Sequence, residues 1–456
     1  MRVRSKRTII IAIIAVLLIT ITLNSFLALA HSLPLGSDVE AALPSRYVGV
    51  TFGGNNTGDA KLLIDRVKSY TNLFVIQSGA VSKNETALTE ISQYAITARM
   101  SIIVYFGYLD TQNPWQLSWL KAAKDQWGNQ FLGAYLDDEP IGVMLDYNWN
   151  GFFNAQKQQN SSIYQTHAFA IDGLLTGTYP HNHDEAASLS QVSIEKNLAP
   201  LKTNSITTFT SDYVLYWFGY KGGYDVMLTQ LGWNESITQN LDLIRGAARL
   251  QNKNWGSIIT WKYTQAPYLD DGQEIYDQMI TSYEAGAKYI IIFNYPQLPN
   301  NPYGTLQDQH FEALQRFWNT INNHSQKLPD LSQSQAVLVL PRNYAFGLRG
   351  PNDRVWGYWE PDKNAAQVWN ISQILLSKYG LGLDIVYEDP VFPIADKYPV
   401  LYYWNQTIMT TQLNSQTPSA NMSSGCHKLA NGSSMYRTVV SPRWSFGVRS
   451  SENIRR

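Results

Sequence analysis

The chain has 456 residues, of which 44% are hydrophobic and 16% are charged, and its formal net charge is −1. This length exceeds one ordinary core and suits a barrel of about 250 residues followed by a smaller unit. The balanced charge excludes a basic field for nucleic acid, so no such partner is expected. The 14 Trp and 28 Tyr side chains either fill the core or line a cleft for sugars, whose apolar faces flat rings cover.

The N-terminus predicts export. Four basic residues within the first seven precede an uncharged run at 8–23, and Ala28-Leu29-Ala30 offers a signal-peptide cleavage site. The apolar stretch 8–30 is also long enough to remain as a transmembrane anchor. In both cases the basic flank stays inside, so residues 1–30 place the body outside the cell or on its surface.

Glycosylation and cysteine content fit an external protein. N-x-[ST] sequons, which predict glycosylation in an exported chain, occur at Asn55, Asn84, Asn160, Asn234, Asn323, Asn370, Asn405, Asn421 and Asn431. Cys426 is the only cysteine, which excludes an intramolecular disulfide. Stability must therefore come from a large core, as in a prokaryotic surface protein.

Short apolar strands alternate with helices over residues 45–325. The predicted strands are 47–51, 73–77, 101–106, 131–136, 206–210, 225–231, 257–261 and 289–293. Asn113-Pro114 and the Ser236/Gln239 pair are helix starts. The alternation predicts an α/β fold, a TIM (β/α)8 barrel. No helix is predicted between the fifth and sixth strands. Residues 141–204 are expected to form a long excursion over the end of the fourth strand. Within it, 165–170 could also be a strand, which would change the strand assignment.

A second, smaller unit follows the barrel. Residues 326–335 form a polar linker, and 336–407 predict a small α/β domain with strands 336–340, 383–387 and 400–404 around a helix at 364–379. Residues 408–456 are rich in Ser, Thr, Asn and Gly without periodicity, which predicts a disordered tail.

The end of the fourth strand carries Asp137, Asp138, Glu139 and Pro140. In such barrels the reacting residues lie where strands end. Strand alternation places Asp137 and Glu139 on one face and Asp138 on the other. Two carboxylates along one strand can serve glycoside chemistry, one as acid and the other ionised. The alternative is a structural turn in which Asp138 caps a helix.

Other strand ends supply polar and aromatic residues that suit a sugar site. The predicted substrate-binding residues are Gln77, Tyr105, Trp261, Lys262, Tyr263 and Asn294, and Gln230 ends the sixth strand. Besides Asp137, Asp212 is the best candidate for the second carboxylate of the reaction. The predicted binding residues also have structural alternatives, since Gln77 and Asn294 can satisfy backbone groups and Lys262 can be a solvated charge.

His181, His183, Asp184 and Glu185 have the composition of a metal cluster, but such a run is also typical of a helix N-terminus. The helix start is the preferred interpretation, so no metal and no cofactor are predicted.

The segment 133–140 resembles the strand-4 segment of clan-A-type glycoside hydrolases, where Asn-Glu-Pro carries the acid/base. The resemblance implies Glu139 as acid/base, with Asp138 in place of the Asn. That clan has a nucleophilic Glu at the end of strand seven, where this chain has Thr260-Trp261-Lys262-Tyr263. Asp137-x-Glu139 also resembles the tail of the chitinase-type Asp-x-Asp-x-Glu motif, with Tyr135 replacing the earlier Asp. There the acetamido group of the substrate is the nucleophile.

The unit at 336–407 is similar in placement to the amidotransferase-like domain that follows the barrel in some β-galactosidases.

The sequence thus leads to two hypotheses. The first is a glycosidase acting on external carbohydrate, with Glu139 as proton donor and Asp137 or Asp212 as partner. The second is a non-catalytic glycan-binding or envelope protein on a retired hydrolase barrel, which the missing strand-7 Glu favours. The oligomeric state is not indicated.

Overall fold

The computed structural model describes residues 46–109, 111–146, 149–161, 164–165, 168, 171–172, 180–233, 235–296, 298, 300–323, 328–410 and 438–439. The predicted signal or anchor segment, Cys426 and most of the predicted tail lie outside them. Among the described residues, no helix combines the length and the apolar character needed to cross a membrane.

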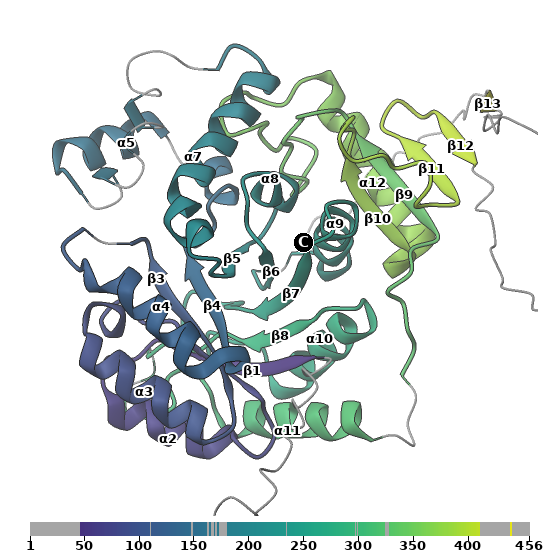
Figure 1. Cartoon of the computed structure of the whole chain (residues 1–456). Coiled ribbons are helices and arrows are strands. Elements are labelled where there is room, and N and C mark those ends of the chain that lie inside the picture. Colours follow the sequence, from purple (N-terminus) through teal and green to yellow (C-terminus); the bar gives the residue numbers. More distant parts are fainter. Residues whose placement is uncertain are drawn as a thin grey trace, which may run out of the picture. The chain divides into compact units, whose positions relative to one another are not determined.

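Eight parallel strands close into a barrel with helices around it (Figure 1). The strands are β1 (Tyr47–Phe52), β2 (Leu73–Ile76), β3 (Ser101–Gly107), β4 (Phe131–Leu136), β5 (Thr208–Asp212), β6 (Val226–Leu231), β7 (Asn254–Ile259) and β8 (Tyr289–Ile292). The barrel closes through β1, where Gly49 pairs with Leu73 of β2 and Tyr47 pairs with Tyr289 of β8. The predicted TIM barrel is confirmed.

The barrel helices begin largely where the sequence signals predict. They are α2 (Thr57–Val67), α3 (Glu85–Thr97), α4 (Trp115–Trp127), α7 (His183–Thr203), α8 (Tyr216–Lys221), α9 (Ile237–Leu250), α10 (Gly272–Glu284) and α11 (Asp308–Asn322), with the short turns η1 (Val81–Lys83) and η2 (Gly128–Gln130). Ser236 Oγ accepts the Gln239 N–H at 3.3 Å. The side chain of Asp271 likewise accepts the N–H groups of Gln273 and Glu274. These caps satisfy amides that the first helical turn leaves unpaired.

The interior of the barrel is a packed core of inward-facing side chains. They are Tyr47, Leu73, Val75, Ile103, Tyr135, Phe209, Val226, Leu228, Ile258, Tyr289 and Ile291. Tyr47 stacks on Tyr289 at 5.1 Å, and Phe209 meets the same ring edge-on at 5.3 Å. Because this core fills the barrel, a ligand can enter only at an end, among the loops that follow the strands.

Much of the described part of the excursion between β4 and β5 is helical. It contains η3 (Gly142–Leu145), α5 (Trp149–Gln158) and α7. Gln165 and Ala168, the described residues of the alternative strand at 165–170, are helical. The rest of that stretch lies outside the described residues.

The expectation of no helix between β5 and β6 is wrong, because α8 lies there (Figure 1). Its residues Tyr216, Trp217, Phe218 and Tyr220 are all buried. Trp217 meets Phe392 at 5.6 Å and Phe218 meets Trp356 at 4.6 Å, so α8 packs against the C-terminal region as well as the barrel. A helix buried all round shows no amphipathic period, which is why the pattern did not reveal it.

The C-terminal region forms a five-stranded sheet in the order β10-β9-β11-β12-β13. Its elements are β9 (Ala336–Leu340), α12 (Lys363–Tyr379), η4 (Gly380–Gly382), β10 (Leu383–Tyr387), β11 (Val400–Tyr403), β12 (Ile408–Thr410) and β13 (Thr438–Val439). β9 is parallel to β10 and β11, and β12 is antiparallel to β11. The sheet is therefore mixed, with a βαβ unit at its centre.

Helix α9 joins the barrel to this sheet. Gly246 permits the contact, because a Cβ there would lie 2.9 Å from the Ile385 carbonyl oxygen and 2.8 Å from Val386 Cγ1. Arg245 Nε donates to Asp384 Oδ1 at 2.8 Å, and its Nη2 donates to Asp242 at 2.9 Å. Asp384 also accepts Arg249 Nη1 at 2.7 Å. Two arginine side chains of α9 thus pair with the buried carboxylate of Asp384, across the junction between the barrel and the sheet.

Candidate active site

A cavity of about 220 Å³ opens at the C-terminal end of the barrel strands. Its lining residues come from the ends of strands and the loops beyond them. They are Gln77, Asp138, Glu139, Ser211, Gln230, Trp233, Ile258, Thr260, Trp261 and Phe293. The lining combines two carboxylates with amides, hydroxyls and three aromatic rings, which is a polar site with an apolar wall.

Asp138 is held by a hydroxyl network at the base of the cavity. Ser211 Oγ donates to Asp138 Oδ1 at 2.6 Å, and the Tyr135 hydroxyl lies 2.8 Å from the same oxygen. Gln230 Nε2 donates to Ser211 Oγ at 2.9 Å. Burial raises the pKa of Asp138, whereas the hydroxyl hydrogen bonds lower it. The side chain is thereby fixed toward the interior of the barrel.

Glu139 follows in a left-handed conformation, with φ 55°. Its N–H donates to the Ser211 carbonyl at 2.9 Å, which ties the turn to β5. Burial raises the pKa of Glu139 to about 7, the negative charge of Asp138 adds to the rise, and a hydrogen bond from Gln230 opposes it. A carboxyl group with this pKa can donate and accept a proton near neutral pH.

The predicted sharing of a face by Asp137 and Glu139 is wrong. β4 ends at Leu136, and Asp137 and Glu139 both have positive φ, at 56° and 55°. Strand alternation therefore stops before these residues. Asp137 Oδ2 accepts Asn197 Nδ2 of α7 at 2.6 Å, so this carboxylate is engaged outside the cavity lining. The pair that lines the cavity is Asp138 with Glu139.

Asp212 is fully buried and does not line the cavity. Its carboxylate accepts the N–H groups of Ile141 at 3.2 Å and Gly142 at 3.1 Å, at the start of η3. Burial raises the pKa of Asp212 to about 8, against the lowering effect of these amides. The structure thus places Asp212 behind the turn that carries Glu139, where it holds the backbone.

Gln77 and Trp261 are the two predicted substrate-binding residues that the cavity brings together with Glu139. The buried Gln77 Oε1 and Trp261 Nε1 find no hydrogen-bond partner in the described part of the chain. The wall of the cavity therefore contains a buried acceptor and a buried donor, although the two residues themselves line the cavity.

The other predicted binding residues lie elsewhere. Tyr105 packs edge-on against Tyr135 at 5.2 Å, behind the cavity lining. Lys262 Nζ pairs with Asp270 at 2.7 Å, and Tyr263 is 44% exposed outside the cavity. Asn294 Oδ1 accepts the Thr305 N–H at 2.9 Å, so the structural alternative considered for Asn294 holds.

Ser211, Thr260, Trp233 and Phe293 line the cavity although no binding role was predicted for them. Ser211 and Phe293 stand at ends of predicted strands, so reading every strand end would have included them. Trp233 lies two residues past β6, and no periodic signal extends into that loop. Gln230 was recognised as a strand end and lies in the cavity, where it contacts Ser211.

The comparisons with known proteins concern the fold. No protein-family model and no curated protein sequence matches this chain. Among solved structures, α-L-fucosidase isoenzyme 2 from Paenibacillus thiaminolyticus is similar, with a TM-score of 0.44 and 9% identity over 78% of this chain and 60% of the fucosidase. The chain thus spans less than two thirds of the fucosidase's length.

Two further solved structures are similar to the barrel. Xylanase 10B from Thermotoga petrophila has a TM-score of 0.36 and 10% identity over 60% of this chain and 94% of the xylanase. D-psicose 3-epimerase from Clostridium cellulolyticum has a TM-score of 0.33 and 9% identity over 60% of this chain and 97% of the epimerase. Glycoside hydrolases are thus among the similar barrels, and no activity follows from the likeness itself.

The C-terminal region contributes a cation to the same end of the barrel. Arg349, between β9 and α12, forms an ion pair with Asp146 and lies 5.8 Å from the centre of the Tyr213 ring. Its Nη2 also pairs with Asp353 at 2.8 Å. Burial raises the pKa of the nearby Glu235, and the charge of Arg349 opposes that rise. Residues of the C-terminal region therefore contribute to the electrostatic field around the cavity that contains Glu139.

The run at His181–Glu185 is a helix start, as preferred. Asn182 caps α7, and its side chain accepts the Glu185 N–H at 2.9 Å. The His183 ring packs against Trp359 at 5.1 Å, and burial lowers the pKa of His183. Among the described residues, no group of three His, Cys, Asp or Glu side chains could hold a metal ion.

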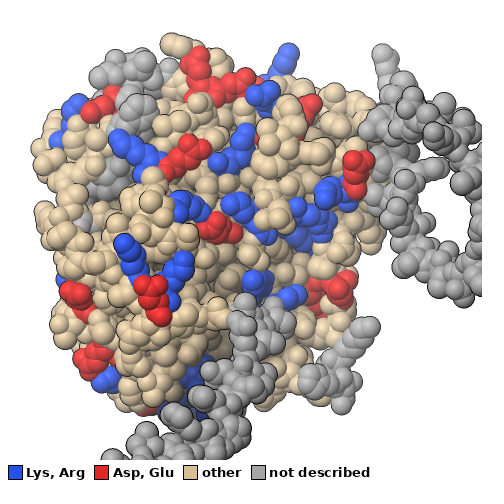
Figure 2. Space-filling model, viewed as in Figure 1, with Lys and Arg blue, Asp and Glu red and all other residues tan. Residues whose placement is uncertain are grey.

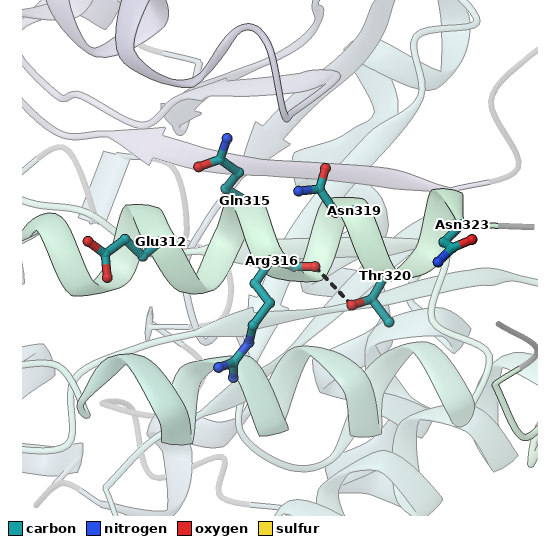
Figure 3. A pocket seen from close by; sticks show the side chains of 6 residues that line it. All are labelled: Glu312, Gln315, Arg316, Asn319, Thr320 and Asn323. Atoms are coloured by element: carbon teal, nitrogen blue, oxygen red, sulfur yellow. Dashed lines mark hydrogen bonds between the residues drawn. The ribbon is translucent and has the colours of Figure 1, made fainter. Parts of the chain in front are cut away.

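A second hollow, of about 350 Å³, runs along α11 and is lined by side chains of that helix and by Asn323, which caps its C-terminal end (Figure 3). Arg316 turns away from Gln315 and Asn319 and lies 3.6 Å from the centre of the Tyr276 ring of α10. Figure 2 shows basic and acidic side chains interspersed on the visible face. Neither the hollow along α11 nor the charged surface brings together groups that could react. The cavity that contains Glu139 is therefore the candidate active site.

Proposed function

We propose that the protein is a glycoside hydrolase that acts on carbohydrate outside the cell. The observation that carries the proposal is Glu139, whose pKa burial and Asp138 raise to about 7 in a cavity walled by aromatic rings. Glycosidases use one carboxylic acid with a raised pKa and one carboxylate near the bond that breaks. Glu139 and Asp138 provide both groups.

In this mechanism Glu139 donates its proton to the oxygen of the glycosidic bond as the bond to the anomeric carbon breaks. Asp138, as the neighbouring carboxylate, stabilises the positive charge that develops on the sugar ring. Water then adds to the anomeric carbon, and its proton returns to the carboxylate pair. The product is a sugar with a free anomeric hydroxyl, and the configuration of that product distinguishes retention from inversion.

The ligand is held by groups of opposite character. Trp261 offers an apolar face to the C–H surface of a pyranose ring. The polar residues of the lining, among them Ser211, Gln230 and Thr260, face the sugar hydroxyls. Export through the predicted segment 1–30 would expose this site to external polysaccharide or surface glycan.

The decisive experiment compares the purified full-length chain with Glu139→Gln on a panel of polysaccharides and aryl glycosides. We expect turnover by the native chain and a loss of about 10²–10⁴-fold in the variant, the usual contribution of a positioned acid. Glu90→Gln, in an exposed ion pair with Lys61 on the barrel's outer helices, is the matched control and should keep full activity. Equal rates in Glu139→Gln and the native chain would remove Glu139 from the mechanism.

A second function is favoured by one specific observation. Asp138 and Glu139 are adjacent residues of one turn, and Thr260 and Trp261 follow β7 where the resembling clan has its nucleophile. Opposed carboxylates from separate strands are the usual arrangement of glycosidases. A glycan-binding protein on a barrel without turnover fits this lining. Binding of one glycan by both the native chain and Glu139→Gln, with no hydrolysis by either, would establish it.

A further inference from the structure

Three aromatic rings continue the cavity wall outward across the loops after β6, β7 and β8. Trp261 lies at the centre, with its ring 6.5 Å from that of Trp233 and 6.2 Å from that of Tyr295. Trp233 is 45% exposed and Tyr295 is 41% exposed, whereas most large apolar side chains of the barrel are buried. Both ring pairs meet edge-to-face, at interplanar angles of 65° and 72°. Neighbouring exposed aromatic rings next to a cavity mark a binding surface.

The backbone holds Trp233 at a conformational cost. Trp233 has φ 51°, in the left-handed region that bulky residues avoid, and its N–H donates to the Trp261 carbonyl at 3.0 Å. Gly53 leaves room for Tyr295, since a Cβ there would lie 2.6 Å from the ring. Strained positions that the surrounding structure maintains are concentrated at functional sites. Trp233 combines such a conformation with exposure.

The surface is continuous with the site that contains Glu139. Trp233 and Trp261 line the cavity itself, and Tyr295 lies beyond them on the β8 side. A ligand that crosses all three rings therefore passes from the reacting carboxylates onto open surface. A single sugar ring would fill the cavity and leave Tyr295 uncovered.

We propose that Trp233, Trp261 and Tyr295 form an extended subsite row, and that the ligand is a linear oligosaccharide segment of several pyranose rings. The inference rests on the proposed carbohydrate ligand and adds its size class. Each pyranose presents C–H faces to the rings and hydroxyls to the polar cavity lining. That mixed chemistry matches a surface whose apolar rings adjoin Gln77, Thr260 and Gln230.

The test measures binding, in the Glu139→Gln background, of cello-, xylo-, manno- and chito-oligosaccharide ladders from monosaccharide to hexasaccharide. For one of these series we expect affinity to rise at least tenfold between the monosaccharide and the longer members. Tyr295→Ala should remove most of this gain and leave monosaccharide affinity within about twofold. Trp233→Ala should weaken the binding of every member of the series, because the Trp233 ring also lines the cavity. Leu62→Ala, an exposed apolar side chain on α2, is the control and should change neither value.

The outcomes separate this inference from the proposed function. The subsite row would be overturned if the affinity did not depend on oligosaccharide length, or if neither aromatic substitution changed the affinity. This would hold even if the native chain hydrolyses short glycosides. Length-dependent binding that needs Tyr295, together with no hydrolysis by the native chain, would keep the row and reject the hydrolase. Sedimentation of the variants adds a third outcome, because loss of a dimer in Trp233→Ala without loss of sugar binding would assign the rings to self-association instead.

Discussion

The backbone N–H of Gly142 donates to both carboxylate oxygens of Asp212, at 3.1 Å each. Asp212 ends β5, whereas Gly142 follows Glu139 by three residues, so the fifth strand fixes the turn that the fourth strand presents. The same Asp212 accepts the Ile141 N–H at 3.2 Å. A carboxylate without access to the cavity therefore governs the position of the proposed acid.

Replacing Asp212 by Asn should destabilise the fold and reduce turnover. An amide nitrogen cannot accept, so one of the backbone N–H groups loses its partner in a buried place. We expect the free energy of unfolding to fall by about 1–3 kcal/mol, measured by urea denaturation. Asp271→Asn is the control, because Asn caps a helix about as well as Asp. Unchanged stability in Asp212→Asn would show that this turn is held by other contacts.

The activity should decline as the pH rises through about 7. Glu139 must be protonated to act as an acid, and the alkaline limb of kcat/KM reports the pKa of the free enzyme. The charge of Asp138 contributes to the raised pKa of Glu139. Asp138→Asn should therefore move the alkaline limb to lower pH. A limb that stays in place would mean that burial alone sets the pKa of Glu139.

Arg245→Met should weaken the whole molecule. The substitution leaves Asp242 and Asp384, both fully buried, without this partner. Breaking such a pair costs about 3–5 kcal/mol, whereas an exposed pair contributes about 0–1 kcal/mol. Lys61→Met, in the exposed pair with Glu90, is the matched control. Urea denaturation with equal midpoints for the two variants would contradict the proposed role of the junction.

Trp233→Gly should be more stable than Trp233→Ala by about 1 kcal/mol, because only glycine adopts positive φ without strain. Both variants lose the same ring contacts, so the difference isolates the backbone. At Val192, within α7, the order should be reversed, since glycine is about 1 kcal/mol less favourable than alanine inside a helix. Thermal unfolding of the four variants measures both differences. The same order at both positions would exclude strain at Trp233.

The eight strands could be predicted because each is a short apolar run between helix signals. The predicted range 206–210 and the observed β5 (Thr208–Asp212) differ by two residues, and β7 starts at Asn254 instead of 257. These shifts do not alter the topology, because parallel closure depends on the order of elements and not on their exact ends.

The site was harder to predict because its geometry depends on backbone conformations without a periodic signature. The positive φ of Asp137 and Glu139 ends the strand alternation from which their shared face was predicted. The cavity then adds Ser211 and Trp233 from other strands and loops. Their place beside Glu139 in the cavity lining is set by closure of the barrel, which no local pattern encodes. Glu139, Gln77 and Trp261 were predicted because they stand near strand ends.

The apolar helix α8 has a consequence for how the chain is made. Its rings meet Trp356, Tyr387 and Phe392, which are translated more than a hundred residues later. Until those residues leave the ribosome, one side of the nascent barrel displays uncovered aromatic surface. We therefore expect the barrel to complete its folding only after the C-terminal sheet has been synthesised, and to need protection from aggregation in the interval.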